Sequence, residues 1–275
     1  MTGRDRAPVP GIAPPLRPAR GGRGSWLRSV GALILREMST THGRSAGGYL
    51  WAFVQPVALI AMLTIVFSLF LRSPSLGTNF VLFYTTGLLP LRIYQEVAKS
   101  LGGALSFNRA LLGYPRVTFA DSILARGILA VLTQLMVFGT VMGLIFVFLD
   151  VREILDYGPI VAALALAVAL GVGAGVMNCF LFTLLPSWSI IWGVITRPLI
   201  FVSGIFYIYE ELPPQAAALL WYNPMLHVTG LMRRGVYATY DAAYVSIPYV
   251  AAFALIPLVA GLLLLRQYNR DLMYL

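Results

Sequence analysis

Charged side chains inside apolar segments are the residues of this sequence best suited to do chemistry. Arg92 interrupts a hydrophobic segment that begins near Phe80. Arg126, five residues after Asp121, lies at the start of another such segment, and Arg197 lies within a third. An arginine at the centre of a membrane span costs about 2.5–3.5 kcal/mol on insertion scales, so it usually faces the protein interior or a watery cavity. These arginines therefore indicate a polar path or structural ion pairs.

Aromatic side chains accompany the arginines. Their rings offer apolar faces to sugar rings while their hydroxyl groups form hydrogen bonds, and a cation attracts acidic sugars or a phosphate. We therefore assign six residues to a hypothetical substrate path: Tyr84, Arg92, Tyr94, Trp192, Phe206 and Tyr207. Two alternatives stay open, because such rings also anchor proteins at membrane interfaces and Arg92 can pair with Glu96, four residues on.

The sequence lacks the motifs of an enzyme or of a motor. The only lysine, Lys99, follows Ala98, so there is no Gly-x-x-x-x-Gly-Lys loop to hold nucleotide phosphates. Cys179 is the only cysteine, and the two histidines are far apart, which argues against a disulfide or a metal centre. A row of buried acids, the usual proton relay of a secondary transporter, is also missing. We expect no catalytic residue and no bound cofactor, and an energy source in another polypeptide.

The composition is that of an integral membrane protein. Of the 275 residues, 59% are hydrophobic and 11% are charged, with a mean hydropathy of +0.79, whereas soluble chains carry about 25% charged residues. The net charge of +9 is concentrated before Trp51 and beside the hydrophobic segments. This distribution follows the positive-inside rule and argues against nucleic-acid binding.

The hydrophobic segments predict an all-α protein with six transmembrane helices. Their expected ranges are Leu50–Leu71, a segment from near Phe80 that Arg92 and Glu96 interrupt, Gly127–Leu149, Ile160–Leu185, Trp188–Ile208 and Ile247–Leu265. The fourth carries small residues every four positions, which predicts close helix packing, at Ala163, Ala167, Gly171 and Gly175. Loop charges predict cytoplasmic termini, with residues 150–158 and 210–244 outside.

Three further segments lie outside these spans. Residues 1–24, rich in Arg, Pro and Gly, are expected to be a disordered cytoplasmic tail, and residues 25–275 to form one transmembrane domain. Trp26–Thr40 predicts an amphipathic interfacial helix, either a simple anchor or a platform for a partner. Glu210–Tyr244 is semi-apolar but too short for two crossings, so it predicts a re-entrant pair of half-helices or, alternatively, an outer loop with one amphipathic helix.

Several short motifs occur in a fixed order along the chain. They are Gly48-Tyr49-Leu50-Trp51, Gln55-Pro56, Asn108-Arg109-Ala110-Leu111-Leu112-Gly113-Tyr114-Pro115-Arg116-Val117, Asp121, Ala125-Arg126, Leu212-Pro213, Tyr222-Asn223-Pro224-Met225-Leu226-His227 and Arg233. Over about residues 26–270 the chain resembles the permease subunit of type 2 ABC exporters, and most of all the branch that exports capsular polysaccharide in Gram-negative bacteria. The long tail departs from that pattern, as does Arg92, where an apolar or aromatic residue is expected.

The resemblance implies a homodimer in the bacterial inner membrane, served by two separate ATPase subunits that bind ATP and Mg²⁺. Its substrate would be a lipid-linked polysaccharide, and periplasmic and outer-membrane export components would be further partners. ATPase coupling would fall to Arg36, Arg109, Tyr114 and Arg116, and the outer gate to Asn223, Pro224, His227 and Arg233. The alternatives are permeases for O-antigen, teichoic acid or small hydrophobic drugs, a secondary transporter, and a membrane scaffold without transport activity.

Overall fold

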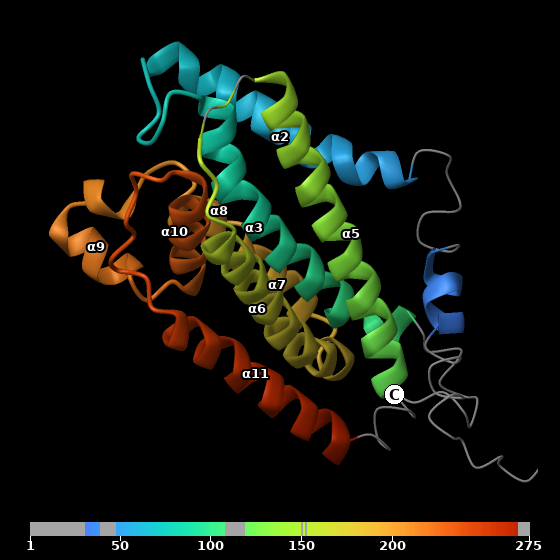
Figure 1. Cartoon of the computed structure of the whole chain (residues 1–275). Helices are drawn as coiled ribbons and strands as arrows, with labels where there is room; N and C mark the ends of the chain where they lie inside the picture. Colours follow the sequence, from blue (N-terminus) through green and yellow to red (C-terminus); the bar gives the residue numbers. More distant parts are fainter. Residues whose placement is uncertain (1–30, 39–47, 108–118, 150, 152, 269–275) are drawn as a thin grey trace, which may run out of the picture.

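The computed structural model describes residues 31–38, 48–107, 119–149, 151 and 153–268, and the regular structure of these residues is helical (Figure 1). The predicted tail lies outside the described residues. Of the predicted interfacial helix, residues 31–38 are described, and they are helical. The elements that follow are α2 (Gly48–Phe70), α3 (Phe80–Gly102), α5 (Phe119–Phe148), α6 (Tyr157–Leu184), α7 (Trp188–Thr196), α8 (Leu199–Val202), η1 (Tyr209–Glu211), α9 (Pro214–Leu220), α10 (Pro224–Val236) and α11 (Ile247–Gln267).

Helices α2, α5, α6 and α11 are long and apolar enough to cross a membrane. Helix α3, at 23 residues, reaches about 35 Å and matches them in length, but its charges lower its hydropathy. It occupies the middle of the bundle, where it packs against α2, α5, α6 and α10. The side chain of Asn79 caps its first turn by accepting hydrogen bonds from the backbone N–H groups of Val81 (2.9 Å) and Leu82 (3.4 Å).

Helix α6 packs most extensively against α3 on one side and α11 on the other. The small residues predicted to allow this, Ala163, Ala167, Gly171 and Gly175, are buried, so the packing prediction is confirmed. A Cβ atom added at Gly171 would lie 3.0 Å from the backbone oxygen of Tyr94 in α3. On the other side, a Cβ atom at Gly261 of α11 would lie 2.8 Å from the backbone nitrogen of Met177. Glycine therefore sets the helix spacing on both sides of α6.

The predicted fifth span is a broken helix. Helices α7 and α8 are separated at Arg197-Pro198, and α8 ends at Val202 rather than at Ile208. Proline has no backbone N–H, so it interrupts the helical hydrogen bonds at this point. The side chain of Gln95 in α3 donates to the backbone oxygen of Thr196 at 3.4 Å. A turn through Gly204 (φ +72°), a backbone conformation that glycine tolerates, then ends the helical path.

The other boundaries lie close to the predicted ones, with one exception. Helix α5 begins at Phe119, eight residues before the predicted Gly127. The prediction began after the charges of Asp121 and Arg126, whereas the structure buries Asp121 and gives Arg126 an ion-pair partner. Between α8 and α11, the chain forms the short elements η1, α9 and α10, and α10 is buried on most of its surface against α3, α6 and α11.

We predict that Gly175→Leu destabilises the bundle. A Cβ atom at this position would lie 2.7 Å from Leu101 Cβ and 3.1 Å from Ala98 Cα, and overpacking of this kind costs about 1–3 kcal/mol. The thermal unfolding midpoint of the purified protein in detergent should fall. Gly139→Leu on α5 is the matched control, because an added Cβ meets no atom within 4 Å there. Equal midpoints for the two variants would contradict the close α3–α6 packing.

Candidate functional site

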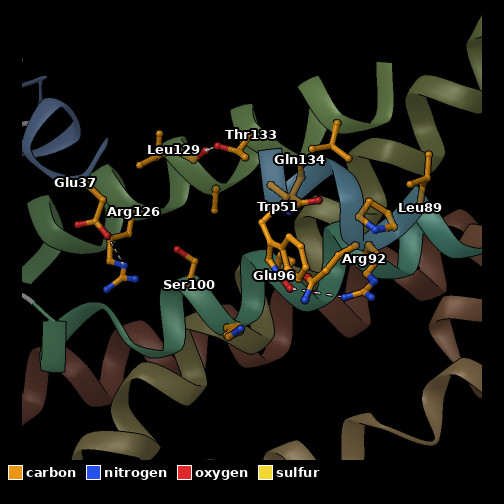
Figure 2. Close-up of a pocket in the computed structure, with 16 residues that line it drawn as sticks. Glu37, Trp51, Leu89, Arg92, Glu96, Ser100, Arg126, Leu129, Thr133 and Gln134 are labelled. Carbon is orange, nitrogen blue, oxygen red and sulfur yellow. Dashed lines mark hydrogen bonds and ion pairs between the residues drawn. The ribbon is translucent and has the colours of Figure 1, made fainter. Parts of the chain in front are cut away.

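A charged cavity of about 410 Å³ lies between residues 31–38, α2, α3 and α5, and we call it the α3 cavity (Figure 2). It is lined by Glu37, Trp51, Ala52, Gln55, Pro56, Leu89, Arg92, Glu96, Lys99, Ser100, Arg126, Leu129, Ala130, Thr133, Gln134 and Val137. These residues come from the helix of residues 31–38, the first turns of α2, the part of α3 from Leu89 onward and the part of α5 up to Val137. The cavity therefore runs from one end of the bundle to about its middle.

Arg92 and Glu96 face this cavity together from α3. Their side chains form an ion pair at 4.0 Å and are 25% and 34% exposed, so the pairing with Glu96 that was left open as an alternative is present, while Arg92 also lines the cavity. Lys99 follows three residues later, and positions i, i+4 and i+7 share one helix face. One side of α3 thus presents two cations and one carboxylate to the cavity.

Arg126 lies at the edge of the same cavity, where other groups of the protein bind its guanidinium. Its Nε atom lies 3.3 Å from Glu37 Oε1, with side chains 13% and 6% exposed. Its Nη1 donates to the backbone oxygen of Gly103 at 3.3 Å, and its guanidinium lies 4.3 Å from the centre of the Phe107 ring. This pair joins residues 31–38 to α5. The sequence analysis missed Glu37, although it is the only acidic residue between Asp5 and Glu96.

A second, largely apolar cavity of about 460 Å³ lies on the other side of α3, among α6, α7, α10 and α11. Tyr94 and Trp192 of the hypothetical substrate path line it, together with the predicted gate residues Asn223 and Pro224. Tyr94 and Trp192 therefore share a cavity, whereas Arg92 lines a different one.

Tyr84 and Phe206 belong to an aromatic cluster. Each ring packs against Phe67 of α2, at centroid distances of 5.5 and 5.4 Å. Tyr84 is 1% exposed. Tyr207 contributes its backbone oxygen, which accepts a hydrogen bond from Arg233. The six residues of the hypothetical path thus lie in different surroundings within one copy of the chain.

Arg233 ties α10 to the turn after α8. Its Nη1 donates to the backbone oxygen of Tyr207 at 2.7 Å, and its Nη2 donates to that of Ile205 at 3.0 Å. The guanidinium also lies 4.0 Å from the centre of the Phe83 ring in α3, and the residue is 2% exposed. A desolvated arginine with this set of partners fixes the three segments relative to one another.

Asn223 and His227 fix the start of α10 through hydrogen bonds to neighbouring segments. Asn223 caps α10 by accepting from Met225 N (3.0 Å) and donates to the backbone oxygen of Val202 (2.8 Å). His227 lies 2.7 Å from the backbone oxygen of Trp221 through Nε2, while its Nδ1 accepts from the backbone N–H of Ser246 (3.3 Å). These two bonds together require the neutral imidazole with the proton on Nε2.

The segment between α10 and α11 makes a further hydrogen bond to η1. Tyr240 donates through its hydroxyl group to Glu210 Oε2 at 2.9 Å. This bond joins the segment after α10 to η1.

Comparison with known proteins identifies the family. Residues 28–237 match the family described as ABC-2 type transporter. The chain belongs to this family. It is 30% identical to the polysialic acid transport protein KpsM of Escherichia coli over 238 residues, which cover 86% of this chain and 92% of the relative.

Two other relatives match this chain over a similar share of its length. The capsule polysaccharide export inner-membrane protein CtrC of Neisseria meningitidis serogroup B is 28% identical over 244 residues, 88% of this chain and 92% of the relative. The corresponding protein BexB of Haemophilus influenzae is 25% identical over 244 residues, with the same coverage.

Of the predicted coupling residues of this ABC-2 transporter protein, the structure describes one. Arg36 is exposed on the helix of residues 31–38, whereas Leu33 and Glu37 of the same helix are buried. Arg109, Tyr114 and Arg116 lie outside the described residues. Their role in coupling stays a prediction.

We predict that the Glu37–Arg126 pair stabilises the ABC-2 domain. Glu37→Ala leaves Arg126 buried without its carboxylate, which costs about 3–5 kcal/mol in comparable pairs. The amount of folded protein and its unfolding midpoint should both fall, and Glu37→Leu combined with Arg126→Leu should recover part of the loss. Asp241→Ala is the control, because its pair with Arg234 (3.7 Å) is exposed and worth about 0–1 kcal/mol. Equal stability of the two single variants would refute this role.

Proposed function

We propose that this chain is the transmembrane subunit of an ATP-driven exporter that moves lipid-linked capsular or related polysaccharide from the cytoplasm across the inner membrane. The observation that carries the proposal is the extent of the similarity. Relatives named for capsule polysaccharide export and polysialic acid transport match more than four-fifths of the chain. The family match over residues 28–237 includes the α3 cavity and the segment that Arg233 fixes.

ATP hydrolysis belongs to a separate partner subunit in this proposal. The sequence has no Gly-x-x-x-x-Gly-Lys loop, so this chain has no P-loop for nucleotide phosphates. ATP and Mg²⁺ would bind to the partner, which would contact Arg36 and the segment containing Arg109, Tyr114 and Arg116. The exposed position of Arg36 on residues 31–38 is consistent with such a contact.

We place the end of the bundle where α3 ends and α5 begins in the cytoplasm. Lys99 lies in the last turn of α3 and Arg266 in the last turn of α11, and Figure 1 shows these two helix ends at the same end of the bundle as the start of α5. The segment joining α3 to α5 carries Arg109 and Arg116. The opposite end carries acidic loop residues, among them Glu210 and Asp241. The positive-inside rule favours this orientation, with both termini cytoplasmic.

A second copy of the chain would complete the path. Arg197 is exposed at the break between α7 and α8, amid exposed apolar residues such as Val194 and Phe201. A charge at that depth is unfavourable in lipid, so we propose that this surface faces a second copy and a watery path between them. Trp192 lies on the same broken helix.

We further propose that residues 210–244 re-enter the membrane as an outer gate. The four long apolar helices, together with α3 and α7–α8, would then make six spans. Helix α9 has 7 residues and α10 has 13, and at about 1.5 Å per residue neither crosses ~30 Å of hydrocarbon. Helix α10 is nevertheless buried inside the bundle. Short helices are tolerated at such depth when protein surrounds them.

The export proposal predicts that Arg92→Leu lowers surface glycan about tenfold and leaves glycan inside the cell. A charged contact to the substrate is worth about 1.5–3 kcal/mol, or roughly tenfold or more in rate. The measurement is surface and intracellular glycan in cells that depend on this permease, with its abundance followed by immunoblot. Arg234→Leu, which removes an exposed charge outside the cavity, is the control. Normal surface glycan with Arg92→Leu would exclude Arg92 from the path.

A further inference from the structure

The α3 cavity contains polar side chains that the protein itself leaves without partners. Within the described residues, the side chains of Gln55, Ser100 and Gln134 line the cavity and form no hydrogen bond with another protein group. They come from three different helices, and Gln134 lies at the middle of α5. Polar groups at this depth need water or a polar ligand, because hydrocarbon offers no hydrogen bonds.

The charge of the cavity is positive where a ligand can reach it. Arg126 and Glu37 satisfy each other at one edge. The remaining charges are Arg92 and Lys99 against Glu96, and the Arg92–Glu96 distance of 4.0 Å is at the limit of an ion pair. An anion that enters the cavity can therefore accept hydrogen bonds from Arg92 and Lys99 without first separating a tight pair.

We infer that the α3 cavity binds the phosphate group of an anionic lipid headgroup. Arg92 and Lys99 supply the charge, and the amide and hydroxyl groups of Gln55, Gln134 and Ser100 supply further hydrogen bonds (Figure 2). The inference deepens the proposed function, on which its biological meaning rests, because a lipid-linked substrate has a headgroup region that an exporter must hold.

The rim of the cavity favours a lipid over a free anion. Trp51 lines the cavity and is 63% exposed in the first turn of α2, and tryptophan rings prefer the headgroup level of a membrane. The outward surface of α2 beyond it is apolar, with Val54 and Val57 exposed. A headgroup in the cavity can thus keep its acyl chains against this surface.

The test measures lipid binding to the full-length permease purified in detergent. The probes are dioctanoyl phosphatidylglycerol, dioctanoyl phosphatidylcholine and inorganic phosphate, and the readout is the dissociation constant from native mass spectrometry or thermophoresis. Phosphatidylglycerol should bind more tightly than phosphatidylcholine. Arg92→Gln should weaken it about tenfold, as expected for one charge-assisted hydrogen bond, and Arg92→Lys should restore part of the affinity.

Glu96→Gln provides a test in the opposite direction. It removes the competing carboxylate and should tighten phosphatidylglycerol binding, whereas a variant that merely damaged the fold would weaken it. Arg234→Gln, outside the cavity, should leave the affinity unchanged. Inorganic phosphate that displaces the lipid only at much higher concentration supports a lipid-borne phosphate, and phosphate that binds as tightly as the lipid overturns that part.

Unchanged binding in both Arg92→Gln and Glu96→Gln would overturn the site itself. Because this measurement uses purified protein and defined lipids, its failure is separable from that of the export proposal, which is read from glycan on cells.

Discussion

The structure depends on keeping one charged helix away from lipid. Helix α3 carries Arg92, Glu96 and Lys99 on a single face, and a charge exposed to hydrocarbon costs several kcal/mol. Helices α2 and α5, together with residues 31–38, enclose that face and leave the cavity between them. The Glu37–Arg126 pair closes its edge. Position and polarity of the cavity thus follow from where α3 carries its charges.

The other faces of α3 are covered by elements adapted to close approach. Glycines on α6 set the spacing on one side, and α10 covers another. Arg233 extends this arrangement, since its guanidinium packs on Phe83 of α3 and binds the turn after α8. A movement of α3 relative to α6 would therefore be transmitted to the segment proposed as the outer gate. This connection gives a physical route between the half of the bundle that holds the α3 cavity and the opposite end.

The apolar spans could be predicted from the sequence because membrane-crossing helices need long uncharged segments, and the small-residue stripe of α6 could be predicted from its spacing. The family could also be predicted, from short motifs that occur in a fixed order along the chain.

The ion-pair partner of Arg126 could not be predicted, because Glu37 lies 89 positions earlier and local spacing carries no information about such contacts. The separation of Arg92 from Tyr94 into two cavities was equally hidden, since these residues are two positions apart but face different sides of α3. The early end of the fifth span results from Pro198 and Gly204, whose effects hydropathy does not register.

The central claim is that the α3 cavity is a watery recess that reaches the middle of the membrane from the cytoplasm. It is tested most directly by thiol labelling of Gln134→Cys, in a Cys179→Ser background, because Gln134 lines the cavity halfway along α5. Leu132→Cys, two residues away and 59% exposed on the outside of the bundle, is the matched control, since thiols need water to ionise and react. A membrane-impermeant reagent should modify the cysteine at 134 in inside-out vesicles and spare it in spheroplasts, while the cysteine at 132 stays unmodified in both. An unreactive cysteine at 134, or equal labelling at the two positions, would contradict the account.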